Sequence, residues 1–89
     1  MPRVIFAPHL QRHVPCPPQS VAAPTLGAAL EAAFKSAPAL RGYVLDDQGH
    51  IRKHVAVFID GRLWHARDRL DAPVAPDARI DVIQALSGG

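Results

Sequence analysis

The last two residues, Gly88 and Gly89, are the part of the chain with the clearest chemical potential. Two consecutive glycines add no side chain to a core and lose backbone entropy when they become ordered. They also leave the end of the chain thin and conformationally free, so that its carboxylate can enter a narrow channel. Residues 86–89 reach roughly 13–14 Å when they are extended, which predicts that this end can enter the active site of another protein.

The Gly89 carboxylate is the group in this tail that can carry chemistry. A terminal carboxyl has a reference pKa of about 3.5, so it is anionic and unreactive at neutral pH until something activates it. A frayed end is the simpler interpretation of two glycines, because chain termini are commonly disordered. The domain in front of the glycines must therefore decide between these two interpretations.

The histidines and the cysteine are weaker candidates for chemistry. The five histidines lack the spacing of a metal motif and no carboxylate cluster accompanies them, so surface or strand-edge positions are expected. They are His9, His13, His50, His54 and His65. Cys16 stands between prolines, and nothing in the adjacent sequence predicts an activated thiol. We therefore expect no internal disulfide, no bound metal and no bound cofactor.

Charged residues of both signs are mixed along the chain, which has a formal net charge of +2. This charge is too weak and too scattered to predict binding to nucleic acid or to a membrane. Asp46 and Asp47 could form a carboxylate pair for acid–base work, but a solvated turn explains them more simply. Four arginines of the second half are expected to form a solvated rim, with contact to an acidic partner surface as the weaker alternative. They are Arg62, Arg67, Arg69 and Arg79.

The length of 89 residues, with 48% hydrophobic and 20% charged residues, predicts one globular domain. The apolar run near the N-terminus, residues 4–7, is too short for a signal peptide or a membrane span. A cytoplasmic protein is therefore expected. We divide the chain into a domain of residues 1–85 and a flexible tail of residues 86–89.

The clearest predicted element is a helix, for which Thr25 stands at the N-cap position. Apolar residues then recur at helical spacing and form a single stripe. They are Leu26, Ala29, Leu30, Ala33, Phe34 and Ala37. Glu31 and Lys35 are spaced for an ion pair on the exposed side. Pro38 ends the helix, and residues 40–45 are expected to return to the sheet as an apolar segment.

The strands are predicted from β-branched and alternating residues. Residues 4–7 begin the sheet, residues 9–14 form their hairpin partner, and residues 21–23 complete it. Residues 54–59 form the strongest strand, and Asp60-Gly61 is the signature of a type I′ turn into residues 62–64. Residues 79–85 form the last strand. This order predicts an α+β protein of the β-grasp, ubiquitin-like fold, a mixed sheet of four to five strands with one main helix on one face.

Over most of its length the chain resembles the ThiS/MoaD family of ubiquitin-like sulfur carriers. The resemblance rests on Thr-Leu-Gly-Ala-Ala-Leu at 25–30, Val-Ala-Val-Phe-Ile-Asp-Gly at 55–61, Leu-Asp-Ala-Pro-Val at 70–74, and Ile-Asp-Val-Ile at 80–83 before the diglycine. The long connection 37–53 resembles that of the carrier that serves a cysteine synthase. Ala56 stands where many members have Asn, and Gln84-Ala85 replaces a proline-containing approach to the tail.

The resemblance implies a carrier protein that is not itself an enzyme. Gly89 would be adenylated by a ubiquitin-activating-like partner enzyme, which uses ATP. A sulfur donor such as a rhodanese or a cysteine desulfurase would then convert it to a thiocarboxylate. The thiocarboxylate would deliver sulfur to a synthase of molybdopterin, thiamine or cysteine biosynthesis. The alternative is a ubiquitin-like modifier that is conjugated through Gly89 to target lysines.

The resemblance also implies docking of the partner enzymes through one face of the sheet. Alternation along the strands places Val55, Val57, Ile59, Ile80 and Val82 toward the helix. Phe58 and Ile83 should then face solvent on the other side, with Leu86, Ser87 and Gly88 leading to the terminal carboxylate. These five residues are the predicted docking set, and Gly89 is the predicted reacting residue.

Overall fold

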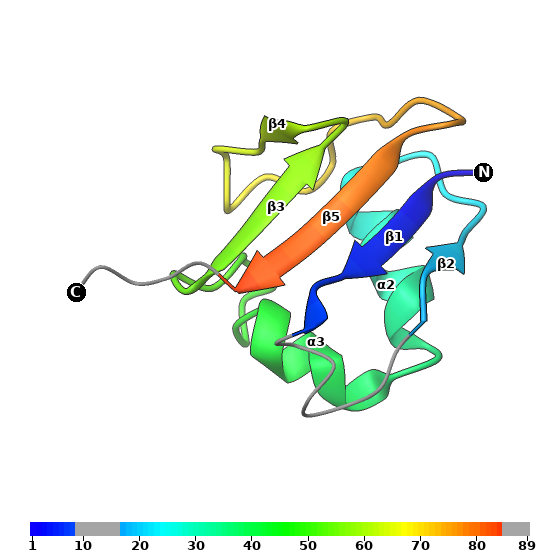
Figure 1. Ribbon diagram of the computed structural model, residues 1–89. Helices are drawn as coiled ribbons and strands as arrows, with labels where there is room; N and C mark the ends of the chain where they lie inside the picture. The colour runs from blue at the N-terminus through cyan, green and yellow to red at the C-terminus, as the bar shows by residue number, and fades with distance from the viewer. Residues whose placement is uncertain (9–16, 85–89) are drawn as a thin grey trace.

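The computed structural model describes residues 1–8 and 17–84 of the chain. Its elements, in chain order, are β1 (Arg3–Phe6), β2 (Gln19–Ser20), α2 (Leu26–Phe34), α3 (Pro38–Val44), β3 (Val55–Ile59), β4 (Arg62–Leu63) and β5 (Arg79–Gln84). The strands form one sheet in the order β2-β1-β5-β3-β4. Helix α2 crosses one side of this sheet, and α3 follows at one end of it (Figure 1).

Strand β5 occupies the centre of the sheet, although it is the last element of the described chain. It runs parallel to β1 and antiparallel to β3. Short antiparallel partners, β2 and β4, close the two edges. A mixed sheet of this order, with a helix across one side, is the β-grasp or ubiquitin-like fold. The fold predicted from the sequence is therefore confirmed.

The core lies between the sheet and the two helices. Every second residue of the central strands is buried there, as the alternation predicts. Val55, Val57, Ile80 and Val82 are at most 1% exposed. Helix α2 contributes five of the six residues of the predicted apolar stripe; it ends at Phe34, before Pro38, and the buried Ala37 precedes α3. The rings of Phe34 and Phe6 stack with their centroids 6.0 Å apart. One apolar stripe covers one side of the sheet, and neither helix of the described residues lies on the other side.

The N-terminus of α2 is capped twice. The Thr25 hydroxyl accepts a hydrogen bond from the Ala28 amide at 3.1 Å, which confirms the predicted N-cap. In addition, the Gly27 amide donates to the Leu70 carbonyl at 2.7 Å, and the Leu26 amide donates to the Ala72 carbonyl at 3.0 Å. These bonds satisfy amides that have no partner within a helix. The loop before β5 is therefore fastened to the start of α2.

The close contact at Gly27 leads to a stability prediction with an internal control. A Cβ atom built on Gly27 would stand 2.9 Å from the Leu70 carbonyl oxygen, whereas one on Gly42 in α3 meets no atom within 4 Å. We expect Gly27→Ala to lower the free energy of unfolding by about 1–3 kcal/mol, because the backbone of the loop must shift. Gly42→Ala is expected to raise it by up to about 1 kcal/mol through helix propensity. Urea denaturation measures both, and equal effects would contradict the close contact.

Three local predictions are wrong. Residues 38–44 form the helix α3, with Pro38 at its first turn, and not an apolar return segment. Glu31 pairs with Arg41 of α3, whose Nε lies 2.8 Å from the carboxylate, and not with Lys35. The second strand is Gln19–Ser20, so it ends before Val21. The predicted hairpin partner at 9–14 and Cys16 lie outside the described residues.

The predicted turns agree with the backbone. Asp60 and Gly61 have φ angles of 51° and 81°, the positive values that a type I′ turn requires. Asp46–Gly49 also turns, and Gly49 has a φ of 79°. Within the residues described, neither helix is long and apolar enough to span a membrane.

Candidate functional site

The predicted reacting residue, Gly89, lies outside the described residues, as do Leu86, Ser87 and Gly88. The described chain ends at Gln84, the last residue of the central strand β5. Gln84 is paired with Val55 at the beginning of β3. The tail is therefore rooted at the end of the strand that the rest of the sheet surrounds.

The side of the sheet away from the helices carries the predicted docking residues. We call it the open face, and it includes Ile5, Ala56, Phe58, Leu63, Asp81 and Ile83. The strand register aligns Ile5 with Asp81, Asp81 with Phe58, and Phe58 with Leu63, so these side chains form one row across the sheet. Ile83 and Ala56 form the next pair, nearer to the end of β5. Arg3 and Arg79 form a further pair on this side, nearer to the beginning of β5. The apolar side chains of the open face therefore gather toward the middle and the end of β5.

Phe58 and Ile83 lie on the predicted side of the sheet, but both are half-buried and not fully exposed. The register places Asp81 and Leu63 opposite Phe58, and Ala56 opposite Ile83. Alternation along a single strand does not reveal such cross-strand neighbours. Leu63, on the edge strand β4, is 41% exposed. Their place on the open face agrees with the docking prediction, whereas their role as partner contacts stays a prediction.

One ion pair interrupts the apolar row. Arg79 Nε donates to both carboxylate oxygens of Asp81, at 3.0 and 3.2 Å. This hydrogen bond, and then the negative charge, raise the pKa of the Arg79 guanidinium above its usual value. Surface ion pairs contribute little to stability. The pair therefore makes this part of the open face polar and contributes little to the stability of the fold.

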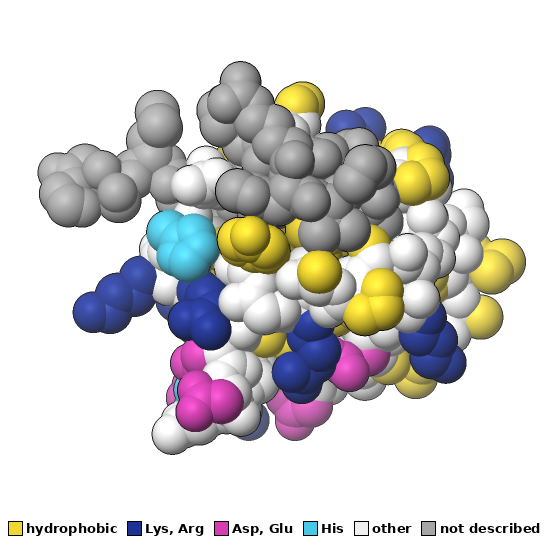
Figure 2. Space-filling view, turned by 90° about the horizontal axis from the view of Figure 1, so that it is seen from below, with side chains coloured by type: hydrophobic (Ala, Val, Ile, Leu, Met, Phe, Trp, Pro, Cys, Tyr) yellow, Lys and Arg dark blue, Asp and Glu magenta, His cyan; other side chains and the backbone are white. Residues whose placement is uncertain are grey.

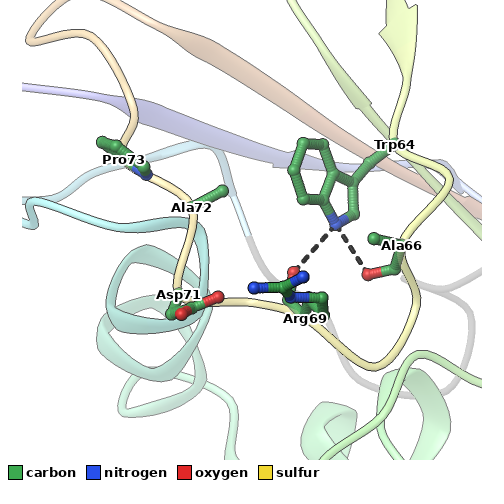
Figure 3. A pocket seen from close by; sticks show the side chains of 6 residues that line it. All are labelled: Trp64, Ala66, Arg69, Asp71, Ala72 and Pro73. Carbon is green, nitrogen blue, oxygen red and sulfur yellow. Dashed lines mark hydrogen bonds between the residues drawn. The ribbon is translucent and has the colours of Figure 1, made fainter.

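A hollow of about 340 Å³ lies beside the edge strand β4 and is lined by Trp64, Ala66, Arg69, Asp71, Ala72 and Pro73. Figure 3 shows the Trp64 indole on one side of it and the Arg69 and Asp71 side chains on the other. The indole nitrogen donates to the carbonyls of Ala66 at 2.9 Å and Arg69 at 3.1 Å. Its polar atom is thus used to hold the loop, and we assign the hollow a structural role.

A second hollow, of about 370 Å³, lies at the beginning of β3 and is lined by Asp46, Ile51, Arg52, Lys53 and His54. This hollow was not predicted from the sequence, although the basic run at 52–54 directly before the strongest strand is a signal for it. The backbone amides of His50 and Gln48 donate to the Asp46 carboxylate, both at 2.9 Å. The bond from His50 is the main cause that lowers the pKa of this carboxyl below its usual value.

Arg67 fastens the backbone of this second hollow. Its guanidinium donates to the carbonyls of Arg52 and Val55, the latter at 2.6 Å. The Ile51 amide in turn donates to the Arg67 carbonyl at 2.9 Å. One half-buried side chain thus joins the loop after β4 to the segment that leads into β3. The predicted role of Arg67 in a solvated rim is therefore wrong.

We expect Arg67→Ala to lower the free energy of unfolding by about 1–3 kcal/mol, because two carbonyls lose a charged donor. The matched control is Arg69→Ala, since the Arg69 side chain is exposed. A surface substitution of this kind changes stability by about 0.5 kcal/mol or less. Thermal and urea unfolding of both variants make the comparison. Equal stability of the two variants would contradict a fastening role for Arg67.

Across residues 1–8 and 17–84, no three histidine, cysteine or carboxylate side chains lie together as a metal site. His50 and His54 lie near the second hollow, and His65 is exposed. His9 and His13 lie outside the described residues.

Comparison with known proteins finds similar solved structures but no similar sequence family. No protein-family model matches the sequence. No curated protein sequence matches it. The fold is similar to that of SAMP1 from Haloferax volcanii, with a TM-score of 0.80 and 23% identity over 99% of this chain and 98% of that one. CysO from Mycobacterium tuberculosis has a TM-score of 0.80 and 16% identity, over 97% of this chain and 100% of CysO.

A third similar structure is a chain of an Amycolatopsis orientalis BexX/CysO complex. It has a TM-score of 0.82 and 12% identity, over 100% of this chain and 100% of the matched chain. The identities are low, so these likenesses show a shared fold. They agree with the ubiquitin-like architecture that the sequence predicts, and the alignments extend over nearly the whole of each chain. The resemblance to the ubiquitin-like sulfur carriers thus holds at the level of the fold.

Proposed function

We propose that this chain is a sulfur carrier of the ThiS/MoaD type and acts as a protein co-substrate of partner enzymes. The observation that carries the proposal is the position of β5. The central strand of a β-grasp sheet leads within five residues to the sequence Gly88-Gly89. The reacting group would be the carboxylate of Gly89. The chain supplies that group and a docking surface, and the catalytic groups belong to its partners.

The chemistry begins with activation, because the Gly89 carboxylate has no good leaving group. One carboxylate oxygen attacks the α-phosphorus of ATP in the partner enzyme and expels pyrophosphate, which gives an acyl-adenylate. A sulfur nucleophile then attacks the carbonyl carbon, and AMP leaves with the electron pair of the C–O bond. Where the donor is a persulfide on a rhodanese or a cysteine desulfurase, a second thiol reduces the resulting acyl disulfide to the thiocarboxylate.

The open face supports the docking part of the proposal. Exposed apolar patches bordered by charge commonly mark partner sites, and Phe58 and Ile83 lie on such a face beside the strand that carries the tail. The structure of a BexX/CysO complex is one of those with a similar fold. It supports a role in which this chain also docks on a partner protein. The sulfur acceptor would be a synthase of molybdopterin, thiamine or cysteine biosynthesis.

The test combines the full chain with the adenylating enzyme of its own organism, ATP and a sulfur donor. We expect pyrophosphate exchange into ATP that depends on the chain. Mass spectrometry should then show a mass increase equal to the exchange of one oxygen for one sulfur, placed on Gly89 by fragmentation. The same spectrum establishes whether Gly89 is the last residue of the native protein. An active enzyme system that leaves the mass unchanged would exclude the carrier function.

A second candidate function is protein modification, in which the activated Gly89 forms an isopeptide bond with a target lysine. The observation that favours it is the similar fold of small archaeal modifier protein 1 from Haloferax volcanii. The two functions share the adenylation step. Trypsin cuts after Arg79, so a conjugated lysine should carry the remnant 80–89. Such remnants on host proteins would establish the modifier, and a thiocarboxylate without them would establish the carrier.

A further inference from the structure

We infer that the basic side chains at the beginning of β3 bind an acidic protein surface at the entrance of the partner site that receives the tail. These side chains are Arg52, Lys53 and His54, and we call them the tail-root cluster. The inference rests on the proposed function and adds a docking contact outside the apolar open face. It assigns the tail-root cluster to the attraction and orientation of the partner, with no part in the chemical steps.

The length of the tail requires contact near this cluster. Val55 pairs with Gln84, so His54 and Lys53 lie at the end of the sheet at which the chain leaves β5. Five residues remain after Gln84, and five extended residues span at most about 17 Å. A partner that holds the Gly89 carboxylate must therefore bring its own surface close to this end of the sheet. The partner's residues around the opening of the site that receives the tail then face the tail-root cluster.

The cluster is held in place by the fold. The Arg52 amide donates to the Val44 carbonyl at 2.9 Å, and Arg52 Nε donates to the Gly42 carbonyl at 2.7 Å. Arg67 binds the carbonyls of Arg52 and Val55 on either side of Lys53 and His54. Figure 2 shows a histidine beside lysine or arginine side chains at one end of the face that it presents, with acidic side chains next to them and further lysine or arginine side chains elsewhere on that face. A fixed backbone lowers the entropy that is lost when such a site binds.

The charge of the hollow predicts the chemistry of its partner. Arg52 and Lys53 are cationic, and Asp46 is the one acidic residue among those that line the hollow. The lowered pKa of Asp46 keeps its carboxyl ionised, so the lining still has an excess of positive charge. The complementary surface is rich in Asp or Glu. Long-range attraction of this kind raises the rate of association and fixes orientation more than it raises affinity.

The two lysines of the chain offer a matched test. Lys53 belongs to the cluster, and Lys35 follows α2, outside this hollow; both are exposed. Lys53→Glu and Lys35→Glu change the net charge equally. In the pyrophosphate exchange assay with the adenylating enzyme, we expect Lys53→Glu to lower kcat/KM for the chain about 10-fold at roughly 10 mM salt and less than about 2-fold at roughly 1 M. Lys35→Glu should stay within about 2-fold of the natural chain under both conditions.

Carbodiimide cross-linking of the natural chain with the same enzyme supplies a direct probe, because this reagent joins an amine to a carboxylate in contact with it. We expect peptide mapping to find Lys53 joined to Asp or Glu of the enzyme and Lys35 unlinked. Equal effects of the two lysine variants, or links at Lys35 alone, would overturn the inference. Pyrophosphate exchange by the natural chain would in that case still support the carrier function. A rise in the KM for ATP alone would assign Lys53 to nucleotide phosphate and overturn it too. Absence of exchange with the natural chain would instead overturn the proposed function and this inference with it.

Discussion

Removal of Gly88 and Gly89 is expected to abolish adenylation and thiocarboxylation and to leave the free energy of unfolding nearly unchanged. The described core residues at the end of the chain are Ile80 and Val82, both fully buried, whereas Gln84 is exposed. The two glycines lack side chains that could add to this core. Their removal shortens the reach of the chain by roughly 7 Å, so that the new terminal carboxylate stops short of the partner's ATP. Exchange assays and urea denaturation of the same sample measure the two effects.

The matched control adds one alanine after Gly89. It keeps both glycines and moves the carboxylate by one residue, so exchange should also be lost although the tail is longer. Geometry at the reacting atoms controls such steps, and displacements of about 1 Å can already cost about 100-fold in rate. A truncated chain that unfolds more easily by more than about 1 kcal/mol would mean that the glycines contact the domain. Retained exchange in either variant would mean that Gly89 is not the reacting residue.

The elements that the sequence predicts well are those specified by neighbouring residues. Thr25 and the apolar stripe after it place α2, and Asp60-Gly61 places the hairpin, because only residues close in the chain take part. The two sides of the sheet follow from alternation for the same reason. Local signals of this kind, in their order along the chain, are sufficient to identify the β-grasp fold.

Helix α3 was missed because its own signals conflict. Pro38 stops one helix and also suits the first turn of the next, and the sequence alone does not separate these roles. Gly42 is a poor helix former. Only Leu40 and Val44 of α3 are buried, too few to establish a helical period. The contact of Arg41 with Glu31 then replaced the predicted local pair, and it exists only once both helices are placed.

The tail-root cluster was the part of the candidate site that was not predicted from the sequence. Its residues are adjacent in sequence, but the feature that makes them a site is the fixed backbone beneath them. Arg67 supplies that feature from 12 residues beyond Val55. The side of the sheet on which Phe58 and Ile83 lie was predicted correctly because it follows the period of a single strand. Phe58 is half-buried, and its cross-strand neighbours Leu63 and Asp81 come from two strand pairings that no local pattern contains.

The second large effect is expected on the open face, where the double variant Phe58→Ala/Ile83→Ala should weaken binding to the adenylating enzyme. The pairing of Phe58 with Asp81, two residues before Ile83, places the two side chains diagonally on adjacent strands. Together they are the bulkiest apolar side chains that β3 and β5 place on the open face. We expect the double variant to bind the adenylating enzyme about 30- to 1000-fold more weakly, which corresponds to about 2–4 kcal/mol for central apolar contacts. Calorimetric titration, or the KM for the chain in the exchange assay, measures this loss.

Stability separates a docking role from a core role. Val57 and Val82 are paired in the sheet on the side of the helices and are at most 1% exposed. Val57→Ala/Val82→Ala should therefore cost more free energy of unfolding for each carbon removed, because it leaves cavities in a closed core. Phe58→Ala/Ile83→Ala removes atoms that are partly in water already, and its cost for each carbon should be smaller. The reverse order in urea denaturation would mean that the two sides of the sheet are wrongly assigned.

A third variant on the same face tests the location of the contact. Leu63 is in the same row as Phe58 but on the edge strand β4, and it is more exposed. Side chains at the border of an interface contribute less to affinity than those at its centre. Leu63→Ala should therefore weaken binding by less than about 10-fold. If Leu63→Ala weakens binding as much as the double variant, the contact is centred on the edge of the sheet and lies away from the root of the tail.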